Sequence, residues 1–262
     1  MKCSNLKILK FRKLKSIQFA MRISKYSNMS NASISNRSLL IPIAISGIIG
    51  ECFLSIYFSG VLVPKNLFTV LTSATQLSNL VMKHRSEIFL DAWLMGIGSI
   101  LSVIFYVGLV YMSGAIVRFS GLLTIIASAV VLAVALVDVT FMVEAANAAI
   151  LGHADTTKVA FDFIAGGGEA FDYTFIFGPA PMLITSIGSV LLRSAIIPRF
   201  FGYAAIAVGV MLFVAGLLSI FYSSAGAITT VFEIVQLSRV IWVLTTAIFI
   251  LIFRKGRGRI GS

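Results

Sequence analysis

Four ionisable residues lie inside long apolar stretches of this 262-residue sequence: Glu51, Asp138, Glu144 and Arg239. A charge in an apolar environment is costly unless an opposite charge or hydrogen bonds compensate it. Ionisable residues in apolar helices therefore commonly form ion pairs, proton relays or solute sites. We expect Arg239 to pair with Glu51 or Asp138, and we take these three residues as a candidate polar binding pocket.

A second group of polar residues could bind a divalent metal ion. His153, Asp155 and Asp172 offer imidazole and carboxylate ligands, with further acidic residues and three consecutive glycines between them. Both ligand types are common in metal sites, but their spacing here matches no established ligand pattern. Acidic residues near Asp172 would also suit the start of a helix, where the helix dipole favours carboxylates. The metal site is therefore the weaker hypothesis.

Motifs of known enzyme classes are missing from the sequence. We find no nucleophile elbow, phosphate-binding loop, zinc-protease motif or dinucleotide fingerprint. Asp138 and Glu144 lie six residues apart, about 120° around a helix, so they cannot act as a close carboxylate pair. Cys3 and Cys52 do not have the spacing of a metal or redox motif. The sequence predicts no catalytic residue and no cofactor, and it favours a protein that is not an enzyme.

The composition shows which environment must hold these residues. The chain is 58% hydrophobic and only 12% charged, with a mean hydropathy of +1.00, whereas soluble domains are about 25% charged. Nine of its 21 basic residues precede Leu39 and four follow Phe253, so the net charge of +11 belongs to the chain ends. These values exclude a soluble enzyme, a disulfide-rich secreted domain and a nucleic-acid-binding protein. The expected partner is the lipid bilayer.

Six apolar runs are long enough for membrane helices, which need about 20 residues each. Lipid offers no hydrogen-bond partner to the backbone, so such runs must be helical. The sequence therefore predicts an all-α integral membrane protein, a bundle of six transmembrane helices. The predicted spans are residues 39–63, 92–117, 121–151, 173–197, 201–222 and 232–253.

The distribution of basic residues predicts the orientation. With a cytoplasmic N-terminus, 16 basic residues fall in cytoplasmic segments and four in external ones, as the positive-inside rule requires. We expect both termini in the cytoplasm and a multi-pass protein in the plasma membrane of a prokaryote. The expected organisation is a basic arm at 1–38, a transmembrane domain at 39–254 and a basic tail at 255–262.

The basic arm has four interpretations. It could anchor the chain to anionic lipid headgroups, be partly disordered, or be a cleaved organellar targeting peptide. Alternatively, translation could start at Met21 or Met29 rather than at Met1.

The rise of 1.5 Å per residue places the buried charges at similar depths. Glu51 and Asp138 fall about 18 Å and 25 Å from the cytoplasmic boundary, and Arg239 about 10 Å from the outer one. All three lie in the outer half, so we expect a polar pocket between spans one, three and six that opens outward. The alternative is a structural ion pair that holds the bundle together.

Three further segments predict how the chain packs. The turn around Pro198 joins spans four and five as antiparallel neighbours. Span five carries Gly202, Gly209 and Gly216 at intervals of seven, which predicts a close packing seam. Residues 65–91 have apolar residues at helical intervals and predict an amphipathic helix on the outer membrane surface.

Two stretches resemble a bacterial family of multi-pass membrane proteins known only as a domain of unknown function. One is residues 66–114, a polar segment leading into a Leu- and Tyr-rich span; the other is LLRSAIIPRFFGYAAIAVG at 191–209. The second is similar to the family's cytoplasmic hairpin, which has a basic residue, Pro-Arg, an aromatic residue and glycine. The resemblance implies a multi-pass membrane protein but no activity and no site residues.

Three functions therefore stay open. The first is a non-enzymatic role in interaction or assembly, for which protein partners are unknown and a homo-oligomer is one option. The second is a small-solute transporter that uses Glu51, Asp138 and Arg239. The third is a metal-assisted enzyme at the outer face that uses His153, Asp155 and Asp172.

Overall fold

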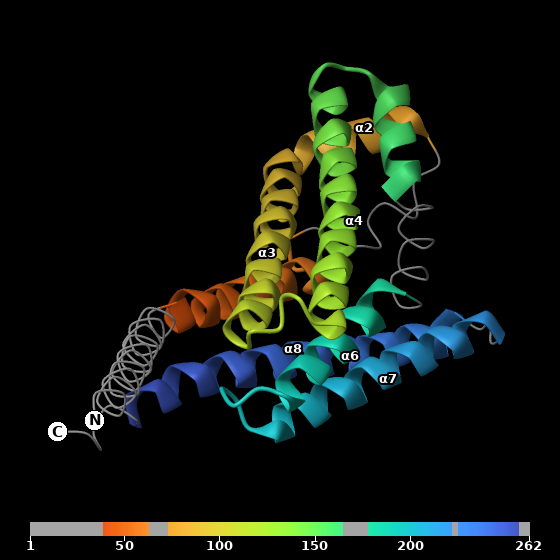
Figure 1. Cartoon of the computed structure of the whole chain (residues 1–262). Coiled ribbons are helices and arrows are strands. Elements are labelled where there is room, and N and C mark those ends of the chain that lie inside the picture. The colour runs from red at the N-terminus through yellow and green to blue at the C-terminus, as the bar shows by residue number, and fades with distance from the viewer. Residues whose placement is uncertain (1–38, 63–72, 165–177, 222–224, 257–262) are drawn as a thin grey trace, which may run out of the picture. The chain divides into compact units, whose positions relative to one another are not determined.

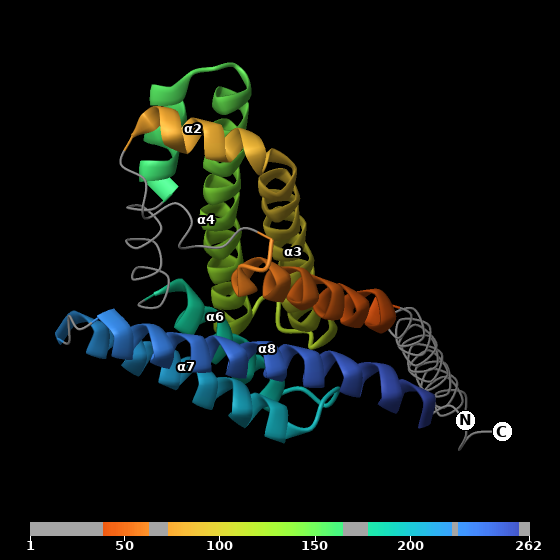
Figure 2. The same cartoon turned by 180° about the vertical axis from the view of Figure 1, so that it is seen from behind.

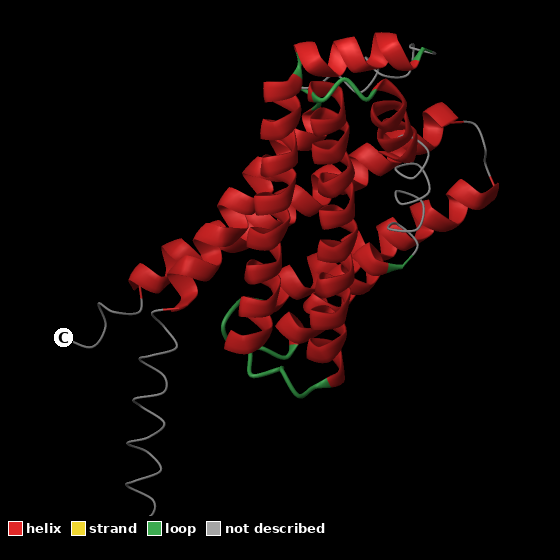
Figure 3. Cartoon of the chain, turned by 90° about the horizontal axis from the view of Figure 1, so that it is seen from above, coloured by secondary structure: helices red, strands yellow, loops and turns green. Residues whose placement is uncertain are grey.

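The computed structural model describes residues 39–62, 73–164, 178–221 and 225–256. It divides into a unit at Met1–Ile41 and a second unit at Pro42–Ser262, and the second unit holds the fold presented below. Helices and short turns make up the described residues, and no strand occurs among them (Figure 3). The helices are Leu39–Ser59, α2 (Ala74–Lys83), α3 (Arg85–Met112), α4 (Phe119–Ile150), 154–164, α6 (Pro179–Leu192), α7 (Arg199–Phe221) and α8 (Ala225–Gly256).

Four helices are long and apolar enough to cross a membrane, in the part of the chain that the structure describes. They are Leu39–Ser59, α3, α4 and the Arg199–Leu218 part of α7, which match predicted spans one, two, three and five. The fourth and sixth predicted spans correspond to shorter apolar helices, Pro179–Leu192 and Leu237–Ile252. The apolar helices indicate a membrane-embedded protein.

The helix ends differ from the predicted span ends for local reasons. The first helix stops at Ser59 rather than residue 63, and Gly60 follows it with a φ of 64°, the left-handed conformation that ends helices at glycine. α3 begins at Arg85 rather than residue 92. The prediction began too late because the first turns of this helix are polar and hydropathy detects only apolar residues. α6 ends at Leu192, well before Pro198.

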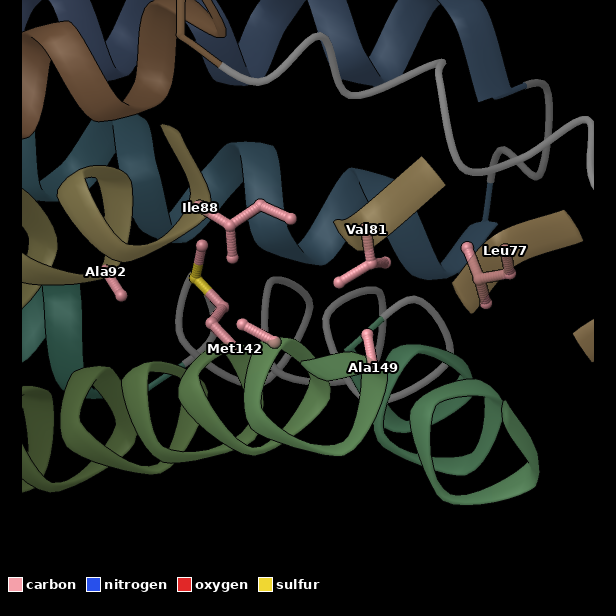
Figure 4. Close-up of a cluster of buried hydrophobic side chains, with 7 residues drawn as sticks. Leu77, Val81, Ile88, Ala92, Met142 and Ala149 are labelled. Carbon is pink, nitrogen blue, oxygen red and sulfur yellow. The ribbon is translucent and has the colours of Figure 1, made fainter. Parts of the chain in front are cut away.

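The predicted surface helix at 65–91 is corrected in two ways. Residues 85–91 belong to α3, and α2 covers Ala74–Lys83. The part of the prediction at 65–72 lies outside the described residues. The apolar face of α2 is buried in a cluster with residues of α3 and α4 (Figure 4). That face therefore packs against protein rather than against a lipid surface. The cluster comprises Leu77, Val81, Ile88, Ala92, Met142, Ala146 and Ala149.

The close seam predicted on span five is confirmed between α6 and α7 at Gly202 and Gly209, whereas the part of Gly216 in it stays a prediction. A Cβ atom added to Gly202 would lie 2.9 Å from the carbonyl oxygen of Gly188, and one added to Gly188 would lie 2.8 Å from that of Gly202. A Cβ on Gly209 would meet the backbone nitrogen of Thr185 at 3.0 Å. Glycine is required here because the two backbones touch, which gives antiparallel neighbours in lipid their dispersion contact.

A second close contact joins the first helix to α3. A Cβ on Gly50 would lie 2.9 Å from the backbone nitrogen of Ser102 and 3.0 Å from the carbonyl oxygen of Gly98. A Cβ on Gly47 would enter the ring of Phe105 at 2.6 Å. Residue 51 is thereby held directly against α3.

α7 and α8 run side by side and cross the α3–α4 hairpin at a steep angle (Figures 1 and 2). A hydrogen bond between α4 and α6 supports the arrangement, since the buried hydroxyls of Thr124 and Ser186 lie 2.8 Å apart. Helices that cross steeply touch over a short patch, so the residues at the crossing decide how they are joined.

Candidate functional site

Of the two partners predicted for Arg239, Glu51 or Asp138, the structure shows an ion pair with Glu51. Arg239 Nη1 on α8 donates a hydrogen bond to Glu51 Oε1 on the first helix over 2.9 Å. The Glu51 side chain has no exposed surface and that of Arg239 is 12% exposed. The two residues are 188 positions apart in sequence, so this pair ties the beginning of the fold to its last helix.

α3, which is predicted span two, also contributes to this site. Ser102 Oγ donates to the same Glu51 oxygen over 3.3 Å. Tyr106, one helical turn further along α3, is 2% exposed and lies within electrostatic range of both Glu51 and Arg239. Predicted spans one, two and six therefore all contribute side chains to the site.

Short-range sequence features place these groups. The close approach of Gly50 to Ser102 and Gly98 sets the distance between the first helix and α3. Ser102 and Tyr106 are four residues apart, so they lie on one face of α3. Neither glycine stood out in the sequence, because isolated small residues are common in apolar helices.

Trp242 completes the site and was missed by the sequence analysis. It lies three residues after Arg239, on the same face of α8. Its ring stacks on Tyr106 with centroids 6.4 Å apart and planes 6° apart. Its Nε1 donates to the carbonyl oxygen of Phe201 over 2.9 Å, so it joins α8 to α3 and to the first turn of α7. The i, i+3 spacing from a buried arginine was the only available signal.

The electrostatics of the site are balanced but incomplete. The opposite charges of Glu51 and Arg239 attract each other, which offsets part of the desolvation cost that either charge would carry alone in the interior. Glu51 Oε1 accepts two hydrogen bonds, whereas Oε2 is buried and accepts none from the described residues. The arrangement can hold helices together and can also offer one acceptor to a small molecule.

Three other acidic residues take different positions. Asp138 is half-buried on α4, and its part in a shared pocket stays a prediction. Glu144 is exposed on the same helix. Asp91, on α3, is only 4% exposed; the sequence analysis placed it outside span two, because the apolar run begins one residue later.

The metal hypothesis lies partly outside the described residues. His153 and Asp155 are exposed next to the start of helix 154–164, and the His153 carbonyl oxygen accepts a hydrogen bond from Thr157. Asp172 lies outside the described residues. Within the described ranges, no group of three His, Cys, Asp or Glu side chains could hold a metal ion. A metal site that includes Asp172 stays a prediction.

Comparison with known families gives this geometry its context. A family model described as Domain of unknown function (DUF4386) matches residues 38–253. The chain belongs to this family. The DUF4386 match contains Glu51, Ser102, Tyr106, Arg239 and Trp242, so the whole site lies in the family domain. No curated protein and no solved structure matches the chain.

Replacing Arg239 by leucine should destabilise the protein by about 3–5 kcal/mol, because it leaves the buried Glu51 carboxylate without its counter-charge. Replacing Lys158 by alanine breaks the exposed Lys158–Asp162 pair and should cost less than about 1 kcal/mol. Reversible unfolding of the purified proteins in detergent measures both values. Equal losses of unfolding free energy for the two substitutions would show that the buried Glu51–Arg239 pair stabilises the protein no more than an exposed pair does.

Proposed function

We propose that this DUF4386 protein is a multi-pass membrane protein of a prokaryotic plasma membrane, with six membrane crossings and both termini in the cytoplasm. The four long apolar helices and two shorter ones support the six crossings. The 16 to four distribution of basic residues supports the orientation. In this arrangement the basic arm meets the anionic headgroups of the inner leaflet.

The shortest crossing sets a requirement. α6 has 14 residues and is about 21 Å long, against about 30 Å of hydrocarbon. A crossing by α6 therefore requires more residues than this helix contains.

The outward faces of the helices support contact with lipid. α4 presents Leu122, Ile126 and Val130 at four-residue intervals, each more than 40% exposed. Soluble monomers seldom expose such continuous apolar surface. Of the four candidate spans, α4 is the least covered, with 22% of its most apolar stretch buried against 39–56% in the others. This face is available to lipid or to another membrane protein.

Within the membrane, we propose a non-enzymatic role in interaction or assembly, with a second copy of the chain as the simplest partner. The closed ion pair carries this proposal. Glu51 and Arg239, the charges expected to serve chemistry or transport, form an ion pair with each other, with side chains that are 0% and 12% exposed. Such a pair fixes one arrangement of helices, and the exposed α4 face remains for contacts.

A small-solute transporter is the second candidate function. One observation favours it: Glu51 Oε2 is a buried acceptor with no hydrogen bond from the described residues. The exposed positions of His153 and Asp155 give the metal-assisted enzyme no comparable support.

Two cysteine variants test the proposed topology in a background with Cys3→Ser and Cys52→Ser. Thr156 and Ala195 are both exposed and lie on opposite sides of α6 in the chain. We expect Thr156→Cys to react with a membrane-impermeant maleimide in intact cells, and Ala195→Cys to react only after permeabilisation. Labelling of both in intact cells would contradict the topology.

Subunit counting tests the proposed role. Single-molecule photobleaching of a fluorescent fusion, in native-lipid particles from cells at low expression, should show more than one copy per particle. The variant Ile126→Trp enlarges the exposed α4 face, and Val210→Trp makes the same change on the exposed face of α7. If α4 contacts the partner, only Ile126→Trp should reduce the copy number. Single copies throughout would contradict assembly and favour the transporter.

A further inference from the structure

A cleft of about 280 Å³ lies between α2 and the end of α4, and it shares no lining residue with the Glu51 site. One side of this cleft is a stripe of α2 that comprises Thr75, Ser78, Asn79 and Met82. Their i, i+3, i+4, i+7 spacing places them on one face of the helix. In volume the cleft is close to small-ligand pockets, which begin at about 300 Å³.

The other face of α2 holds this stripe in place. Leu77 and Val81 are buried in the apolar cluster against α4 (Figure 4). Ser78 is buried next to them, at 8% exposed, whereas Thr75 and Asn79 are exposed. Because the apolar face fixes the helix, the polar side chains of the stripe stay at the cleft without any ligand.

The opposite wall is also fixed by regular structure. It comprises Ala149, Ile150, Gly152 and Ala154. The backbone nitrogen of Gly152 donates to the Ala149 carbonyl oxygen over 3.1 Å, and that of His153 donates to the Ala148 carbonyl oxygen over 2.8 Å. With a φ of 76° at Gly152, this is the Schellman motif, in which a glycine ends a helix. Both walls are therefore formed in advance, which lowers the entropy that a ligand must overcome.

The chemistry of the lining restricts what the cleft can bind. Thr75 and Ser78 carry hydroxyls and Asn79 carries an amide, so the α2 side can both donate and accept hydrogen bonds. Met82 and Ile150 supply apolar contact. Among the described residues that line the cleft, none is ionisable. A charged ligand would lose hydration here without meeting a counter-charge, so the lining favours an uncharged molecule.

We propose that this cleft binds a small uncharged molecule with amide groups beside an apolar portion, the chemistry of a capped amino acid. The hydroxyls and the amide of the α2 stripe take its hydrogen-bonding groups, and Met82 and Ile150 contact its apolar portion. The proposal goes beyond the assembly role, and it does not depend on the number of copies in one particle.

Equilibrium binding of radiolabelled N-acetylleucinamide to the full chain in lipid nanodiscs tests the proposal, with empty nanodiscs as the blank. This probe is uncharged and joins two amide groups to an isobutyl chain. Two competitors share its skeleton: at about pH 6, N-acetylleucine is an anion and leucinamide is a cation. We expect saturable binding that unlabelled probe displaces and that neither charged compound displaces at the same concentration. Equal displacement by all three, or no saturable binding up to the solubility of the probe, would overturn the proposal.

Asn79→Leu tests the placement of the ligand, and Gln76→Leu is its matched control. Both positions are exposed on α2, but only Asn79 lines the cleft. Each variant replaces an amide side chain by the same apolar one. We expect Asn79→Leu to weaken binding of the probe at least about tenfold, which corresponds to the loss of roughly one hydrogen bond, and Gln76→Leu to leave Kd unchanged. Equal Kd values for the two variants would overturn the placement in this cleft.

Thr75→Val provides a second variant, because it removes a hydroxyl from the cleft and keeps the shape of the side chain. We expect it to weaken binding of the probe as well, while the Tm of the protein in nanodiscs stays unchanged. The unchanged Tm separates the loss of a ligand contact from a loss of folding. Binding at full strength by both Asn79→Leu and Thr75→Val would overturn the role of the α2 stripe.

Discussion

A buried arginine needs a counter-charge, and the ion pair that meets this requirement joins the first and last helices of the described fold. Arg239 reaches Glu51 from the far end of the chain, and the pair forms where the first helix, α3 and α8 meet. In an apolar interior an isolated charge costs several kcal/mol, whereas apolar contacts can be exchanged at little cost. The pair therefore favours one arrangement of these helices over others with equally good apolar packing.

The surrounding residues make this pair geometrically possible. Gly50 and Gly98 allow the first helix to touch α3, so that Ser102 can reach the carboxylate. Trp242 holds α8 against Tyr106 and against the Phe201 carbonyl oxygen. α7 and α8 cross the α3–α4 hairpin (Figure 1), so these two pairs of helices contact each other over a short length. A strong local interaction therefore contributes more to holding the pairs together than it would in a bundle of parallel helices. The glycine contacts between α6 and α7 hold these two helices together as a closely packed hairpin.

Hydropathy predicted most of the helices, because a long apolar run in lipid has no alternative to helix. Opposite charges at similar depths also predicted that Arg239 would pair with Glu51 or Asp138, and the pair with Glu51 is present. The third helix could not be predicted: Ser102 and Tyr106 are unremarkable in an apolar run, and hydropathy carries no information on crossing angles. Asp91 was missed because a window on apolar residues excludes a charged residue at its edge, even when the helix continues through it and buries it. The shortness of α6 has the same origin, since hydropathy counts apolar residues after Leu192 that no longer belong to the helix.

The central claim is that Glu51 and Arg239 act as one charge-balanced unit. Exchanging the two charges tests it most directly, with unfolding stability of the purified protein as the measurement. We expect Glu51→Arg and Arg239→Glu to be severely destabilised as single variants, because each places like charges together in the interior. The combined variant should recover a large part of the lost stability. A combined variant no more stable than the weaker single one would contradict the claim, since the two positions would then act independently.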